Sequence, residues 1–229
     1  INVNTLLLSL SASLLVSLSD MERLDELKDF LQTPKNIIIT THQKPDGDAM
    51  GSSLALYNYL QSFEHDVKVI SPTEFPAYFG YLPGCDEVWN YLENPSLSQI
   101  AIESAELIFC LDFNDLGRIE PLNEFIKKNE TAKLVLIDHH LNPQIDAEWI
   151  LHDTKACSTC ELVYRLYEIL EPAYVPTKEV SECIYTGILT DTASFSNGAT
   201  SKKALEITAH LLDCGLNIIY VQEQLNQNG

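Results

Sequence analysis

Positive charge is scarce in this sequence. Lysine and arginine together number 14, against 33 aspartates and glutamates, and the formal net charge is −19 at pH 7. This deficit excludes a surface that binds long nucleic acid by neutralising phosphates alone, so we expect no binding of long duplexes. It does not exclude phosphate chemistry, because bound cations can reverse the local field of an acidic protein.

Long uninterrupted apolar runs are also few. The stretch "TLLLSLSASLLVSLS" near the N-terminus is too short and too often broken by serine for a transmembrane helix, and neither lysine nor arginine precedes it. An amphipathic pattern, "MERLDELKDFLQ", begins at Met21. We interpret residues 1–20 as a leader and expect no membrane span. A weak signal peptide is the alternative, and it would place the protein in the periplasm.

The cysteines lack the spacing of a zinc site. Cys157 and Cys160 form a C-x-x-C pair, but the sequence has no second such pair to complete a set of four ligands. Cys110 and Cys183 lie in apolar runs, as buried free thiols do. Unpaired cysteines of this kind favour a reducing, cytoplasmic location.

Short apolar runs rich in β-branched residues alternate with helical patterns up to about residue 150, and the rest is mostly helical. Runs of this kind are typical of strands buried on both faces. Their alternation with helices predicts an α/β fold with a parallel sheet flanked by helices. Strands are expected at 36–40, 66–70, 106–112 and 132–138, and helices at about 48–63, 97–104, 120–129, 157–170, 178–190, 201–214 and 217–226.

Acids and histidines follow three of these expected strands, and one more acid ends an apolar helix. In a parallel sheet the carboxyl ends of strands share one edge, where ligands bind. Each residue alone has an ordinary explanation, such as a turn or a helix N-cap. Together they favour a metal centre. The residues are His42, Asp46 and Asp48 after the first strand, Asp112, the run Asp138-His139-His140, and Asp191 in "GILTDTASFSN".

Mixed carboxylate and imidazole ligands suit Mn²⁺, Mg²⁺ or Fe²⁺ better than a thiolate site would. Six such ligands suffice for two cations about 3.5–4 Å apart, which would lower the pKa of a bridging water. The sequence does not choose among the three metals.

Four segments, in order, resemble the motifs of the DHH phosphoesterase family: "HQKPDGDA", "CLDFNDLGR", "IDHH" and "GILTDTASF". The "PDGDAMGSSLAL" form is most similar to the bacterial branch of nano-RNases and phosphatases of 3′-phosphoadenosine 5′-phosphate (pAp). The resemblance implies a catalytic domain at 21–215 and the start of an interdomain linker helix at 216–229. A second, basic domain that members of the family carry has no counterpart in the sequence.

The resemblance also implies a role for each matching residue. Two Mn²⁺ ions would be held by His42 and Asp46 at one position and by Asp48 and His139 at the other. Asp112 and Asp191 would reach both ions. Asp138 would orient a ligand imidazole, and His140 would face the scissile phosphate. Arg118 would contact phosphate or pair with Asp115, and Ser158 and Thr159 would bind phosphate or serve as a plain helix N-cap.

The expected activity is metal-dependent hydrolysis of short oligoribonucleotides, of the 3′-phosphate of pAp, or of pApA. Hydrolysis of inorganic pyrophosphate or polyphosphate at the same centre is the first alternative. A non-catalytic module that binds nucleotides is the second, and the complete set of ligands argues against it. A homodimer is compatible with the sequence, which does not determine the oligomeric state.

Overall fold

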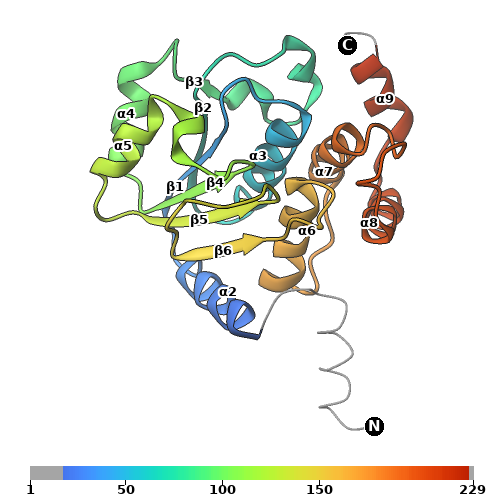
Figure 1. The fold of residues 1–229 in the computed structure, drawn as a ribbon, viewed down its shortest axis with the longest axis horizontal. Coiled ribbons are helices and arrows are strands. Elements are labelled where there is room, and N and C mark those ends of the chain that lie inside the picture. The colour runs from blue at the N-terminus through green and yellow to red at the C-terminus, as the bar shows by residue number, and fades with distance from the viewer. Residues whose placement is uncertain (1–17, 227–229) are drawn as a thin grey trace, which may run out of the picture.

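The computed structural model describes residues 18–226, which form a six-stranded parallel sheet with helices on both faces (Figure 1). The strand order is β3-β2-β1-β4-β5-β6, and each neighbouring pair is parallel. The α/β fold with a parallel sheet is therefore confirmed. The strands are β1 (Asn36–Thr41), β2 (Asp66–Ser71), β3 (Trp89–Asn90), β4 (Leu107–Leu111), β5 (Lys133–Asp138) and β6 (Trp149–His152).

Strand side chains alternate between two separate cores. Ile37 and Ile39 of β1 belong to the larger core, and Ile38 between them belongs to the smaller one. Because both faces are covered, the strand carries apolar residues without the polar alternation of a half-exposed sheet. The larger core contains side chains of α2 (Leu18–Phe30), α3 (Gly47–Leu60), α6 (Thr159–Leu170) and α7 (Lys178–Asp191), and the smaller one those of α4 (Pro95–Glu103) and α5 (Leu122–Lys128).

The direction of strand order reverses between β1 and β4. From β1 the chain continues outward through β2 and β3, then returns to place β4 on the other side of β1. Such a switch point leaves a crevice at the carboxyl ends of the two strands, where α/β proteins bind ligands. The first motif follows β1 directly, and the second begins at Cys110, within the end of β4.

The strands and helices expected from the sequence lie close to their observed bounds, but several short strands and helices were not predicted. Strands β3 and β6 were not expected, nor were the 3-10 helices η1 (Ala77–Tyr81), η2 (Cys85–Glu87) and η3 (Leu116–Ile119). The first described helix starts at Leu18, before Met21, and the remainder of the proposed leader lies outside the described residues.

The C-terminal part consists of α8 (Lys202–Asp213) and α9 (Ile218–Asn226). Val221 of α9 is buried in the larger core, so the helix expected to start a linker packs against the domain. Within residues 18–226, no single helix is long and apolar enough to cross a membrane; α8 and α9 pass that test only as a pair, bent by 113°.

Candidate metal centre

The turn after β1 brings His42 and Asp46 together. Asp46 is the N-cap of α3, and its Oδ1 accepts hydrogen bonds from the backbone N–H groups of Asp48 at 3.0 Å and Ala49 at 3.1 Å. Its other oxygen, Oδ2, lies 3.9 Å from His42 Nε2. The cap and the metal-ligand roles are thus compatible, because each uses a different oxygen of one carboxylate.

Asp112 lies at the centre of the cluster. It follows β4 with a left-handed backbone conformation, φ 65°. Its carboxylate is buried, with Oδ2 3.5 Å from His42 Nε2 and Oδ1 3.5 Å from His139 Nε2. One carboxylate is therefore placed between the histidines of two different motifs.

Helix α7 supplies the last acid. Asp191 is its final residue, and its Oδ2 lies 3.3 Å from His139 Nε2. Asp48 Oδ2 lies 3.8 Å from the same nitrogen. Residues from the first, second and fourth motifs, Asp48, Asp112 and Asp191, thus lie within 4 Å of His139 Nε2.

All six predicted ligands fall into groups whose ligand atoms lie within 4.8 Å of one another. Asp112 belongs to the group of His42 and Asp46, and also to a group with His139 and His140. Asp191 groups with Asp48 and His139. Asp112 is shared between two groups, and the contact of Asp112 and of Asp191 with both ions stays a prediction.

The charges of the cluster conflict unless a cation is present. Burial, and then the charges of Asp112 and Asp191, raise the pKa of Asp48 well above its usual range. Burial and Asp112 raise the pKa of Asp191 to about 7. Burial opposes protonation of His139, but Asp112, Asp48 and Asp191 raise its pKa to about 9. A divalent cation would remove this repulsion, so the donor set fits one.

The first turn of α6 holds two of the predicted ligands. The backbone N–H groups of Thr159 and Cys160 donate to Asp48 Oδ2 at 2.6 Å and Oδ1 at 2.9 Å. The Thr159 hydroxyl donates to Asp112 Oδ1 at 2.9 Å. The positive end of the helix therefore faces an internal carboxylate.

Ser158 and Thr159 were expected to bind phosphate or to cap a helix. Ser158 is the N-cap of α6, and its hydroxyl accepts from Glu161 N at 3.1 Å. Both residues are buried, and their polar atoms already bond within the protein. The N-cap is confirmed, and the geometry does not favour the predicted phosphate contact.

Thr159→Val is expected to weaken divalent-metal binding by roughly 10–100-fold, the usual cost of losing a group that orients a metal ligand. Valine keeps the shape of threonine and the N–H to Asp48 but removes the hydroxyl bonded to Asp112. Calorimetric titration with Mn²⁺ measures the change. Thr159→Ser, which retains the hydroxyl, should bind as the wild type does. Unchanged affinity in the valine variant would contradict this role.

The partner of Asp138 is His140. Asp138 Oδ1 lies 2.7 Å from His140 Nδ1, and His140 Nε2 lies 3.4 Å from a guanidinium nitrogen of Arg118. The imidazole that Asp138 orients is thus the one expected to face substrate, rather than that of the predicted ligand His139. Arg118 makes no side-chain pair with Asp115, whose carboxylate accepts from Gly117 N instead.

Gly187 was not recognised from the sequence. A Cβ on this residue of α7 would lie 2.5 Å from Asp48 Oδ1 and 2.3 Å from Cys160 Sγ. The glycine lets α7 approach α3 and α6 closely enough for Asp191 to reach His139. A glycine inside an apolar helix pattern was the available signal.

The comparisons with known proteins agree with this geometry. The model of the DHH family, N-terminal domain, matches residues 36–188. The chain belongs to the DHH family. The predicted membership of this family is therefore confirmed.

Relatives of this DHH chain include two curated proteins named bifunctional oligoribonuclease and PAP phosphatase NrnA. The one from Thermus thermophilus is 30% identical over 82% of this chain and 53% of its own length, and the one from Bacillus subtilis 31% identical over 77% and 52%. The chain thus spans about half the length of these relatives. A solved structure of an exopolyphosphatase-related protein from Bacteroides fragilis matches with TM-score 0.87 and 32% identity, over 91% of this chain and 61% of that one.

Proposed function

We propose that this chain is the catalytic part of a metal-dependent phosphoesterase that hydrolyses short oligoribonucleotides and the 3′-phosphate of pAp. The observation that carries the proposal is the convergence of all six predicted ligands into groups that share Asp112 and His139. The names of the two curated relatives support the substrate class. Mn²⁺ is our choice of metal because carboxylates and imidazoles together suit it.

The residues of the site have two proposed roles, metal binding and phosphate binding. His42, Asp46, Asp48, Asp112, His139 and Asp191 would hold two divalent cations, which when bound lower the pKa of water and draw in phosphoryl oxygens. Asp138 fixes the ring of His140 through Nδ1, and Arg118 lies at the opposite nitrogen. Both groups are partly exposed, so the guanidinium of Arg118, positioned beside His140, is placed to donate hydrogen bonds to a phosphate and to stabilise its charge.

A second candidate function is hydrolysis of pyrophosphate or polyphosphate at the same centre. The name and the high structural similarity of the Bacteroides fragilis protein favour it. We give it second place because the two relatives named as oligoribonucleases match the chain over most of its length. A purely binding role is disfavoured by the complete set of candidate ligands.

The setting of the reaction is also proposed. The domain would act with a further nucleotide-binding part like the remaining half of its relatives, as a monomer or a homodimer. A cytoplasmic location is supported by the buried, unpaired state of Cys85, Cys110, Cys157, Cys160 and Cys183.

The deciding experiment measures phosphate and mononucleotide release by the complete gene product that contains this chain. The substrates are pAp, pApA, a five-nucleotide RNA and pyrophosphate, each with Mn²⁺, with Mg²⁺ and with EDTA. We expect cleavage of the nucleotides that requires metal, and none of pyrophosphate. Cleavage of pyrophosphate alone would overturn the substrate class, and metal binding without any cleavage would overturn the catalytic assignment.

A further inference from the structure

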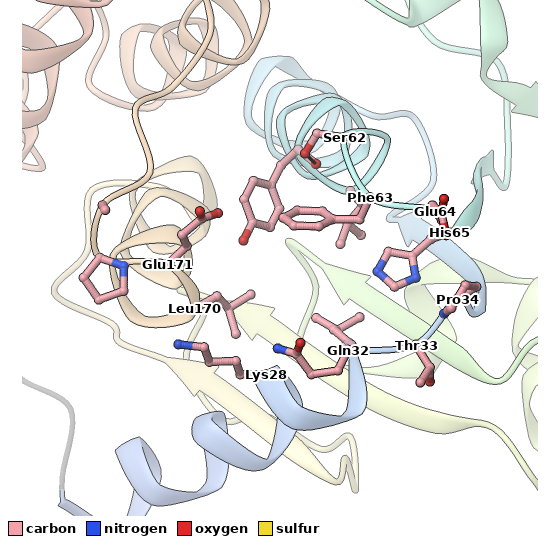
Figure 2. A pocket seen from close by; sticks show the side chains of 15 residues that line it. Lys28, Gln32, Thr33, Pro34, Ser62, Phe63, Glu64, His65, Leu170 and Glu171 are labelled. Carbon is pink, nitrogen blue, oxygen red and sulfur yellow. Dashed lines mark hydrogen bonds between the residues drawn. The ribbon is translucent and has the colours of Figure 1, made fainter.

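A cavity of about 710 Å³ opens at the amino edge of the sheet, opposite the candidate metal centre. Figure 2 shows that its lining comes from the end of α2, the end of α3 and the end of α6, with the chain that follows each helix. Its volume is in the range of sites for small molecules, about 300–1,000 Å³. None of its lining residues belongs to the four motifs.

Aromatic rings form one wall of this cavity. The rings of Tyr59 and Phe63 pack edge to face with centroids 5.2 Å apart, and His65 continues the row 6.1 Å beyond Phe63. Tyr59 is 3% exposed, whereas Phe63 is 41% exposed although it lines a concave site. An open aromatic face in a cavity is suited to stacking against a planar ligand.

Polar groups without partners face the same space. Tyr59 lines the cavity, and among the described residues no hydrogen bond is formed by its hydroxyl; burial and Glu171 raise its pKa, which keeps it a donor. His65 Nδ1 accepts from Lys35 N at 3.2 Å, so its proton lies on Nε2. Burial and Lys35 lower the pKa of His65, which leaves the ring neutral at pH 7.

The rim adds charged and amide groups. In Figure 2 the side chains of Lys28 and Gln32 come from α2 and the turn after it, and Glu171 lies across the opening. Within residues 23–226 none of these three side chains forms an ion pair or a hydrogen bond. The cavity therefore offers several donors and a carboxylate acceptor around an aromatic wall. Glu64 and Glu171 at the rim disfavour a ligand with several negative charges.

We propose that this cavity is a second binding site, for an uncharged planar heterocycle that carries both donors and acceptors on its edge, such as a purine nucleoside. The ring would stack on the exposed face of Phe63. Its edge would accept from the Tyr59 hydroxyl and His65 Nε2 and donate to Glu171. The site is independent of the proposed hydrolysis, because it lies at the other edge of the sheet.

The test is calorimetric titration of the complete gene product with adenosine. We expect saturable binding that Phe63→Ala weakens by roughly tenfold or more, the scale of one lost stacking contact. Phe63 is partly exposed, so this variant should fold. Tyr59→Phe should weaken binding by about three- to tenfold, as expected for one hydrogen bond. Leu97→Ala, an exposed apolar residue on α4, is the matched control and should change nothing.

A second set of probes separates this site from the metal centre. Asp112→Asn should bind adenosine as the wild type does, and adenosine monophosphate should bind the cavity more weakly than adenosine. Indole, a planar ring without acceptors, should bind more weakly too. The proposal is overturned by absence of saturable adenosine binding, by binding that Phe63→Ala leaves intact, by binding that Asp112→Asn abolishes, or by equal affinity for indole.

Discussion

Asp112→Asn is expected to lower metal-dependent hydrolysis by roughly 10³-fold or more, since a single lost charge-stabilising group already costs about 10²–10³. Asp112 lies between His42 and His139, with 3.5 Å to each imidazole. The amide of asparagine has nearly the same shape but one oxygen and no charge, so it cannot serve cations on both sides. Mn²⁺ affinity, measured by calorimetry, should fall together with turnover.

Asparagine is the best replacement for Asp112 because of the backbone conformation at this position. Asp112 has φ 65°, a left-handed conformation that asparagine tolerates far better than alanine or branched residues. An alanine variant would add backbone strain to the loss of a ligand, and its inactivity would be ambiguous. The asparagine variant also keeps the side-chain shape and an oxygen that can accept from the Thr159 hydroxyl, so the metal-free protein should remain folded.

Asp66→Asn is the matched control for the Asp112 variant. Asp66 begins β2 at the opposite edge of the sheet and is exposed, so its substitution should leave metal affinity and turnover unchanged. Full turnover by Asp112→Asn would eliminate the assignment of a shared ligand. Loss of turnover with unchanged metal affinity would show that Asp112 acts in the chemical step and not in metal binding.

The residues that could be predicted from the sequence are those whose position follows from the ends of strands. His42, Asp112 and His139 each come directly after β1, β4 or β5, and parallel strands bring their carboxyl ends to one edge. A continuous apolar run followed by an acid or a histidine was therefore enough to predict that these side chains meet. The fold class followed from the same alternation of buried strands and helices.

The partners of residues distant in sequence could not be predicted in this way. "ACSTC" has the signature of a helix start, but nothing local shows that the anion at this helix terminus is Asp48, 111 residues earlier. Asp138 precedes two histidines, and only the geometry shows that it bonds the second. Strand β6 was missed because it has four residues and its pairing with β5 is what defines it.

Gly187→Ala is expected to destabilise the fold by about 1–3 kcal/mol and to weaken metal binding. Alanine in the middle of a helix would ordinarily stabilise by roughly 1 kcal/mol relative to glycine. Here its Cβ would lie 2.3 Å from Cys160 Sγ and 2.5 Å from Asp48 Oδ1, distances that force neighbours to move. Asp48 is held by two backbone N–H groups of α6, so it cannot move without losing them. Urea denaturation and Mn²⁺ titration measure the two effects.

Two further variants separate the packing effect from the displacement of Asp48. Gly198→Ala is the matched control, because a Cβ there meets no atom within 4 Å, and it should leave stability and metal affinity nearly unchanged. Adding Cys160→Ala to Gly187→Ala removes the sulfur from the crowded space but leaves Asp48 Oδ1 within 2.5 Å of the new Cβ. The double variant should thus regain part of the stability and little of the metal affinity. If the double variant regains both stability and metal affinity, the clash with Cys160 alone explains the defect. If Gly187→Ala binds metal as the wild type does, Asp48 binds no metal from the position it occupies beside α7.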